Sequence, residues 1–288
     1  MRYLILIAIM IAAAGAAQAQ PVRAPPKGLP PAEAEIWPFP PPDPKAWWED
    51  KRPVLPEVAD PLGGRRIGRG ERAIPVDNGV DPSTYRLWGL PPLQWQLLRG
   101  QEMVLEVWVR PARSVRQSVV RITLRRDGKG FVQARAGLAC CEPDIARRMG
   151  FDAELPAAQV QAFAALKADP LWAAPRSIKV SEGADIAEEV CVDGTAYDLT
   201  LVTAGRSRSV RRACDSAAIG QAADVLQPVL RAALGHDQRF DAIFPGGIDF
   251  AAARSAYRDL IAHGGVLKPD PQARPQPPGV APAPDTGG

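Results

Sequence analysis

The sequence predicts an α+β domain, in which an antiparallel β-sheet or meander packs against a few α-helices and disordered, proline-rich segments flank the domain. Apolar and polar residues alternate over 103–110, 120–125 and 131–135, which is the period of half-buried strands. Apolar residues recur at helical spacing over 156–169 and 215–235. The 31 prolines fall mostly in the two terminal segments, where they oppose long helices and sheet ladders.

Residues 1–19 have the features of a bacterial signal peptide. Arg2 supplies a positive charge, residues 3–14 form an unbroken apolar run, and residues 17–19 (AQA) are a small-x-small cleavage site. The apolar run is shorter than the ~20 residues that a membrane-spanning helix needs. We therefore expect cleavage near Ala19-Gln20 and a periplasmic or secreted mature chain with no integral membrane span.

Residues 20–79 form a proline-rich arm that ends in a hinge rich in glycine and arginine at 63–72. Proline fixes φ and lacks the N–H donor, so this arm favours polyproline II. Aromatic residues in such a segment usually dock, here either onto the chain's own domain or onto a periplasmic protein or envelope polymer. The candidate docking residues are Trp37, Trp47 and Trp48.

The folded domain is expected over 80–265 and begins with the three strands named above. On the second and third of them, Arg121, Arg125 and Arg135 occupy positions that alternate with apolar residues. An antiparallel sheet commonly has one face in water, so the prediction places these arginines on a solvated face. Residues 138–155 are expected to be irregular.

Helices are expected on the opposite face of the sheet. Asp215 or Ser216 caps the second predicted helix, and Pro228 inside it predicts a kink or a break into two helices. A last helix is expected over 249–264, where it stops at a pair of glycines. Residues 266–288 form the second disordered, proline-rich tail.

Residues 186–215 predict a three-stranded meander. Asp193-Gly194 is a hairpin signal, because a type I′ turn needs φ > 0 at both central positions, and a looser turn is expected at 204–206. On an edge strand, the positive charges of the third strand would prevent aggregation; alternatively, they bind an acidic partner or an envelope polymer. These charges belong to Arg206, Arg208, Arg211 and Arg212.

The four cysteines are expected to form disulfides in an oxidising compartment. Cys191 and Cys214 would lie at the same end of the meander, so this pair is preferred. Their bond would close a loop of about two dozen residues and stabilise the fold by roughly 3 kcal/mol. Cys140 and Cys141 are adjacent, and a bond between them would be strained, so each could instead pair with Cys191 or Cys214.

Composition and motifs argue against several functional classes. The net charge of +3 is too small to indicate nucleic acid as a partner. Neither His236 nor His263 is near a cysteine in sequence, so no metal site and no cofactor are expected. Both histidines end predicted helices, where an imidazole near the C-terminal dipole is ordinary, and no Gly-x-Ser-x-Gly nucleophile motif is present.

The expected function is therefore an exported, non-enzymatic interaction or envelope-associated module. The alternative is a hydrolase that acts on cell-envelope material through His236 and the nearby Asp237, Asp241 and Asp249. Geometry separates the two hypotheses, because a catalytic His236 would lie in a concave pocket within reach of a carboxylate and a nucleophile.

One resemblance supports the fold and the compartment. The order of residues 193–212 (Asp-Gly-x-x-Tyr, β-run, Gly-Arg, β-run), preceded by a helix and by Trp172, resembles a group of uncharacterised secreted bacterial α+β proteins. The resemblance covers residues 80–235 loosely. It implies an α+β fold and an exported location, and it brings no activity or catalytic residues with it.

Overall fold

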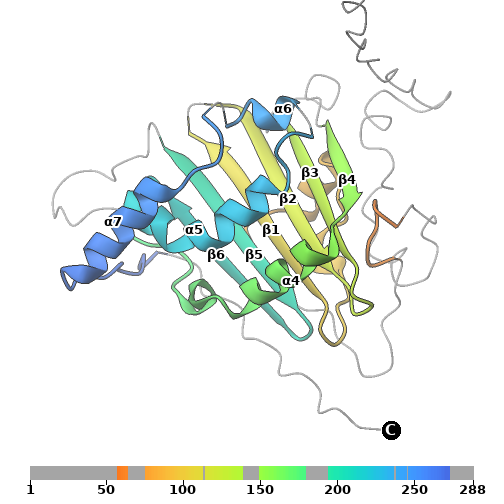
Figure 1. The fold of residues 1–288 in the computed structure, drawn as a ribbon, viewed down its shortest axis with the longest axis horizontal. Coiled ribbons are helices and arrows are strands. Elements are labelled where there is room, and N and C mark those ends of the chain that lie inside the picture. The colour runs from red at the N-terminus through yellow and green to blue at the C-terminus, as the bar shows by residue number, and fades with distance from the viewer. Residues whose placement is uncertain are drawn as a thin grey trace, which may run out of the picture.

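The computed structural model contains a six-stranded antiparallel sheet with helices on one face, which confirms the α+β prediction (Figure 1). The strand order is β4-β3-β2-β1-β5-β6. The structure describes residues 57–63, 75–112, 114–138, 149–179, 194–236, 238–244 and 246–272. The strands are β1 (Met103–Pro111), β2 (Arg116–Leu124), β3 (Gly130–Leu138), β4 (Met149–Glu154), β5 (Thr195–Thr203) and β6 (Arg206–Ala213).

The predicted helices begin after a fourth strand, β4, which lies within the segment 138–155 that was wrongly predicted to be irregular; short helices also precede the sheet. The Asp215 carboxylate accepts a hydrogen bond of 2.6 Å from Ala218 N and so caps the longest helix. This helix continues through Pro228 to Arg231, so the predicted break does not occur. The longer helices are α4 (Ala157–Ala165), α5 (Ser216–Arg231) and α7 (Ala251–Ala262); the shorter ones are α3 (Pro82–Leu87), α6 (Gln238–Asp241) and the 3-10 helices η1 (Leu93–Trp95), η2 (Leu166–Ala168) and η3 (Pro170–Ala173).

The main core lies between the sheet and α5. Leu105 of β1 is paired with Ile122 of β2, and both are fully buried in one cluster with Leu226 and Val229 of α5. Fully burying one such side chain contributes about 1.5–3 kcal/mol. Slipping the register of β1 by one residue would bring Glu106 to the helix side in place of Leu105, so this core fixes the strand register.

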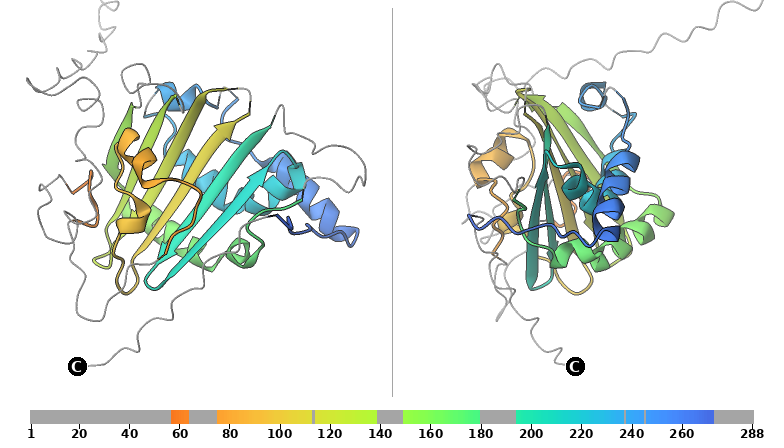
Figure 2. Two further views of the ribbon diagram at one scale, coloured as in Figure 1. Left: turned by 180° about the vertical axis from the view of Figure 1, so that it is seen from behind. Right: turned by 90° about the vertical axis from the view of Figure 1, so that its left-hand side faces the viewer.

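Residues 75–100 cover the other face of the sheet, so the sheet lies between two layers (Figure 2). Trp88 of this segment packs edge-on against Trp108 of β1, with ring centroids 5.2 Å apart. Residues 57–63, which belong to the segment predicted as the arm, also dock on the domain, through Leu62 among other contacts. The sheet therefore has a second buried cluster on the face that was predicted to be solvated.

The structure corrects the prediction that Arg121, Arg125 and Arg135 lie on a solvated face. Arg121 is only 2% exposed and Arg135 only 7%. Arg125 lies at the margin of the covering layer, where it forms an ion pair with Glu57 of the docked segment. The solvated face was predicted wrongly because strand alternation identifies the two faces of a sheet but not what covers them.

Glu106, at the centre of β1, is fully buried and accepts four hydrogen bonds. Arg121 donates to Oε2 from Nε (2.8 Å) and Nη2 (2.6 Å), while Tyr85 (2.6 Å) and Trp108 (2.8 Å) donate to Oε1. Arg121 Nη1 also donates to Pro91 O at 2.6 Å. Burial, together with the charge of Glu106, raises the pKa of Tyr85 well above its ordinary value. This buried network joins the covering segment to the middle of the sheet.

The predicted meander is confirmed in its last two strands. β5 and β6 form a hairpin through the expected turn at 204–205. On its other side β5 pairs with β1, from Met103↔Thr203 to Pro111↔Thr195, so β1 takes the place predicted for the run before Asp193-Gly194. That run, the signal peptide, most of the arm and residues 273–288 lie outside the described residues.

Gly220 marks the contact between α5 and α7. A Cβ added at Gly220 would lie 2.0 Å from Ala253 O and 2.8 Å from Tyr257 Cβ. Replacing glycine by alanine inside a helix usually favours the helix by about 1 kcal/mol. We expect Gly220→Ala to lower the free energy of unfolding by about 1–3 kcal/mol instead, because the two helices must move apart. Urea denaturation measures the change, with Ser216→Ala at the exposed start of α5 as the control. A Gly220→Ala variant that is more stable than the unaltered protein would contradict the close contact.

Candidate functional site

β6 is an edge strand, and its arginines point to different surroundings. Arg206 is exposed at the start of the strand, and Arg208 is half-buried opposite Leu201 on the helix side of the sheet. Arg212 also lies on that side, opposite Tyr197. Arg211 lies on the opposite face, where its side chain is 48% exposed. The predicted group of four is therefore not one surface.

Arg212 is 1% exposed and is fully engaged inside the protein. It donates to Gln221 Oε1 of α5 from Nε (3.0 Å) and Nη2 (2.7 Å), and to Pro175 O from Nη2 (3.1 Å). Its Nη1 donates to Arg176 O (3.2 Å) and Arg211 O (2.7 Å). Burial lowers the pKa of Arg212 to about 10. This side chain holds three parts of the chain together and is not accessible to a partner.

Residues 175–179, here called the strap, run beside the outer edge of β6. Arg211 N donates to Arg176 O at 2.6 Å, as in a short strand pairing. On its far side the strap is joined to residues 268–270 by two backbone hydrogen bonds of 2.9 and 3.0 Å. This end of the sheet edge is therefore covered by the chain itself, which limits edge-to-edge association.

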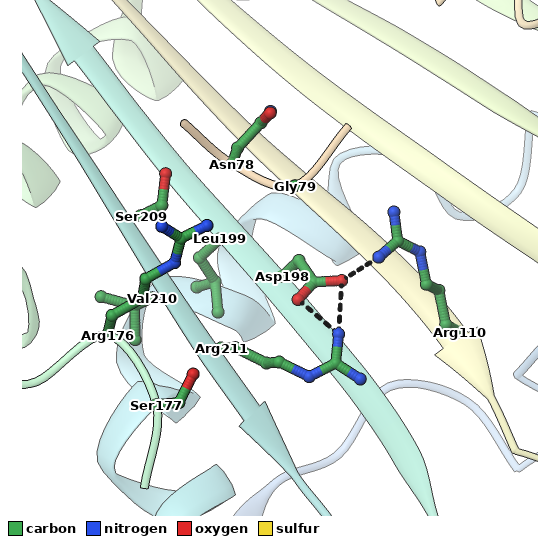
Figure 3. A pocket seen from close by; sticks show the side chains of 10 residues that line it. All are labelled: Asn78, Gly79, Arg110, Arg176, Ser177, Asp198, Leu199, Ser209, Val210 and Arg211. Atoms are coloured by element: carbon green, nitrogen blue, oxygen red, sulfur yellow. Dashed lines mark hydrogen bonds and ion pairs between the residues drawn. The ribbon is translucent and has the colours of Figure 1, made fainter. Parts of the chain in front are cut away.

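A pocket of about 210 Å³ opens between the strap, the turn at 78–79, and strands β1, β5 and β6 (Figure 3). Asp198 of β5 forms ion pairs there with Arg110 of β1 and with Arg211 of β6. Arg211 Nη1 lies 2.9 and 3.2 Å from the two carboxylate oxygens of Asp198. The sheet register explains this group, because Asp198 is directly opposite Arg211 and diagonal to Arg110 across the neighbouring strand.

Arg176 of the strap forms another wall of the pocket. Its Nη1 and Nη2 donate to the two carboxylate oxygens of Asp77 at 2.9 and 3.3 Å. Asn78, which follows Asp77, also lines the pocket. It donates from Nδ2 to Tyr85 OH at 2.7 Å, and its Oδ1 accepts from Val80 N at 3.1 Å. The wall is thus connected through Tyr85 to the buried network, which keeps it in place.

The pocket has an excess of positive charge. Three guanidinium groups, from Arg110, Arg176 and Arg211, lie around one lining carboxylate, Asp198. Among the described residues that line it there is no histidine, cysteine or lysine. Asp198 is paired on both sides, so it is not placed to act as a general base. The arrangement is suited to binding an anion rather than to proton transfer.

His236, on which the hydrolase hypothesis depends, is exposed just beyond the end of α5. Its ring stacks on Phe151 of β4, with centroids 4.3 Å apart, and it does not line the arginine pocket. Asp241 and Asp249 each accept a hydrogen bond from a nearby backbone N–H of 3.0 and 2.9 Å. Asp237 lies outside the described residues. Asp241 is thus held beside the residue that precedes His236, but among the described residues no hydrogen bond or ion pair joins Asp241 or Asp249 to the imidazole.

Cys214 is the one cysteine within the described residues. It follows β6 directly and has a φ of 65°, which is uncommon for a residue other than glycine. Cys140, Cys141 and Cys191 lie outside the described residues, so the Cys191–Cys214 bond stays a prediction. Among the described residues, no group of three or more metal-ligating side chains is present. No helix in this part of the chain is long and apolar enough to cross a membrane.

The sequence named Arg211 as a candidate but did not identify Arg110, Arg176 or Asp198. The pairing of Asp198 with Arg211 was detectable, because the two lie equally far from the turn at 204–205. Arg110 could not be added, since its approach depends on β1 and β5 being neighbours. Trp37, Trp47 and Trp48 lie outside the described residues.

The chain was also compared with known proteins. No family model, no curated protein and no solved structure matches it.

Proposed function

We propose that this chain is an exported, non-enzymatic interaction module that contacts an envelope polymer or a periplasmic protein at the pocket of Arg110, Asp198 and Arg211. The features of residues 1–19 support export, with cleavage near Ala19-Gln20 and a periplasmic or secreted mature chain. The partner is identified by its negative charge, which complements the excess of guanidinium groups in the pocket.

The observation that carries this proposal is the ion-paired arrangement of the pocket. Asp198 is 11% exposed and fixes two guanidinium groups that are themselves 25% and 48% exposed. Arginines held in this way lose little rotamer freedom when they bind a ligand, which favours affinity. Their planar forks match the geometry of oxyanions.

The hydrolase alternative gains no support from the surroundings of His236. A catalytic imidazole needs a nucleophile and an orienting group within hydrogen-bond reach. Among the described residues, His236 contacts Phe151 by stacking and makes no hydrogen bond through its ring. That contact gives the imidazole an ordinary packing role at the end of α5.

The proline-rich arm forms a second part of the proposal. Its first described residues, 57–63, dock on the chain's own domain, where Glu57 forms ion pairs with Arg125 and Lys129 in the turn between β2 and β3. This contact supports docking of that part of the arm onto the domain itself. Binding of a partner through Trp37, Trp47 and Trp48 remains a proposal.

Capture from a cell-envelope extract tests the proposed contact. Immobilised mature chain, beginning at Gln20, is compared with Arg211→Gln and with Arg206→Gln, which removes an exposed arginine of the same strand outside the pocket. We expect the Arg211→Gln chain to retain about tenfold less of the captured component, because one charge-assisted contact contributes about 1.5–3 kcal/mol. The Arg206→Gln chain should retain as much as the unaltered protein.

A third bait separates the arm from the pocket. Deleting residues 21–56 removes Trp37, Trp47 and Trp48 and keeps the docked residues 57–63. Capture that is lost on this deletion but survives Arg211→Gln would place the contact on the arm and contradict the proposed site. Capture of nothing by the unaltered chain, together with turnover of envelope material that requires His236, would overturn the module in favour of the hydrolase.

A further inference from the structure

We propose that the group recognised in the pocket is a carboxylate, bound as a monoanion between Arg110 and Arg211. This inference rests on the proposed function, because it names the chemistry that is recognised at the same site. The carboxylate belongs either to a small organic acid or to the C-terminal end of a peptide chain, and the two sources present the same planar group.

The first argument is the donor capacity that remains in the pocket. Arg110 and Arg211 each use Nη1 to contact Asp198. A guanidinium group has five N–H donors, and the Nε and Nη2 atoms of both side chains make no hydrogen bond to any other described residue. Each arginine thus holds an internal carboxylate on one side and offers a further donor edge to a second.

Ser177 adds a neutral donor from the strap. Its backbone oxygen accepts a hydrogen bond from Asp270 N at 3.0 Å, which fixes the position of the residue. The hydroxyl group lines the pocket and has no hydrogen-bond partner among the described residues. A ligand oxygen placed between Arg211 and the strap can therefore accept from a charged donor and from a neutral one.

Charge balance favours a carboxylate over a phosphate. The guanidinium groups of Arg110, Arg176 and Arg211 face two carboxylates, Asp198 and the Arg176 partner Asp77. Among these described groups one positive charge is left, which a single carboxylate neutralises. A phosphate monoester carries nearly two negative charges at neutral pH and would meet Asp198 at close range with a surplus of negative charge.

The size of the pocket limits the ligand to a small group. A single water needs a cavity of only about 10–15 Å³, so the pocket of about 210 Å³ has room for a small organic group. That space accepts a small acid or the last residue of a peptide.

NMR titration of the full mature chain in chloride-free, low-salt buffer tests the inference. The Nε–H signals of Arg110 and Arg211 are assigned by their loss in Arg110→Gln and Arg211→Gln. The probes are acetate, N-acetyl-trialanine, the C-terminal amide of that peptide, and inorganic phosphate. We expect saturable shifts with acetate and the free peptide acid, and none with the amide. Tighter binding of the peptide acid than of acetate identifies a chain end as the source; equal binding identifies a small acid.

Three variants test whether binding depends on the charged groups of the pocket. Arg211→Gln should weaken binding about tenfold or more, and Arg206→Gln should leave it unchanged within about twofold. Asp198→Asn should strengthen binding, because the amide oxygen can still accept from Arg110 and Arg211 and keep them in place, while the negative charge that repels an anion is removed. Thermal unfolding of each variant confirms that it is folded.

Several outcomes would overturn the carboxylate assignment. They are shifts of equal size with the amide, tighter binding of phosphate than of acetate, equal weakening by Arg206→Gln, and weakening by Asp198→Asn. If envelope capture depends on Arg211 while neither acetate nor the peptide acid binds, the carboxylate is wrong and the proposed function stands. If both bind as expected and envelope capture ignores Arg211, the proposed function is wrong at this site.

Discussion

Replacing Glu106 by glutamine should lower the free energy of unfolding by about 3–5 kcal/mol, because the change breaks a buried ion pair from one side. The amide oxygen can still accept from Tyr85 and Trp108. The new NH₂ group would then face Nε and Nη2 of Arg121, which are donors, and would leave that cation buried without its counter-ion. Urea denaturation followed by tryptophan fluorescence measures the loss, since Trp88 and Trp108 lie in the same buried cluster as Tyr85.

Glu57→Gln is the matched control for that experiment. It makes the same chemical change in an ion pair with Arg125 and Lys129 whose carboxylate is 44% exposed. Exposed pairs contribute about 0–1 kcal/mol, so this variant should stay close to the unaltered protein. A loss below about 1 kcal/mol for Glu106→Gln as well would show that the buried network does not hold the covering segment on the sheet.

Replacing Arg212 by methionine should cost about 2–4 kcal/mol of unfolding free energy. Methionine fills much of the same space but donates no hydrogen bond, so Pro175 O, Arg211 O and Gln221 Oε1 each lose a donor. Each buried polar group left unpaired costs about 1–3 kcal/mol, and partial relaxation of the strap recovers some of this. Urea denaturation gives the total, and hydrogen exchange of Arg211 N–H reports whether the strap has separated from β6.

Arg206→Met distinguishes this structural role from a general effect of losing an arginine. Arg206 lies on the same strand and is exposed, so the change should alter stability by less than about 0.5 kcal/mol. If Arg212→Met were as mild as Arg206→Met, the hydrogen bonds between Arg212 and the strap would contribute nothing measurable. Slow exchange of Arg211 N–H in Arg212→Met would lead to the same conclusion.

The local pattern of apolar and polar residues was sufficient to predict most strands of the sheet and the longer helices. β1 and β3 follow the expected alternation, and α5 begins at the predicted cap, Asp215. β4 was missed because Met149–Glu154 is short and directly follows residues with no clear period. Its partner β3 defines it as a strand, with Phe131↔Glu154 at one end of the pairing and Ala136↔Met149 at the other.

Contacts between distant parts of the chain were not predictable from local pattern. The covering segment is apolar enough to bury Tyr85 and Trp88, but nothing in its sequence states which face of which strands it will meet. The candidate site has the same difficulty. Arg211 is recognisable in the sequence as part of a charged run. Arg110 and Arg176 join the site only because β1 lies beside β5 and the strap lies beside β6.

The pairing of the strap with residues 268–270 has a consequence for when the pocket can exist. Its charged groups come from widely separated positions, and one wall is held by nearly the last described residues. Contacts of such long range form late in folding, because the loop between them must close first. A chain that is still being synthesised from its N-terminus therefore cannot engage an anion at this site. Ligand recognition becomes a property of the finished molecule.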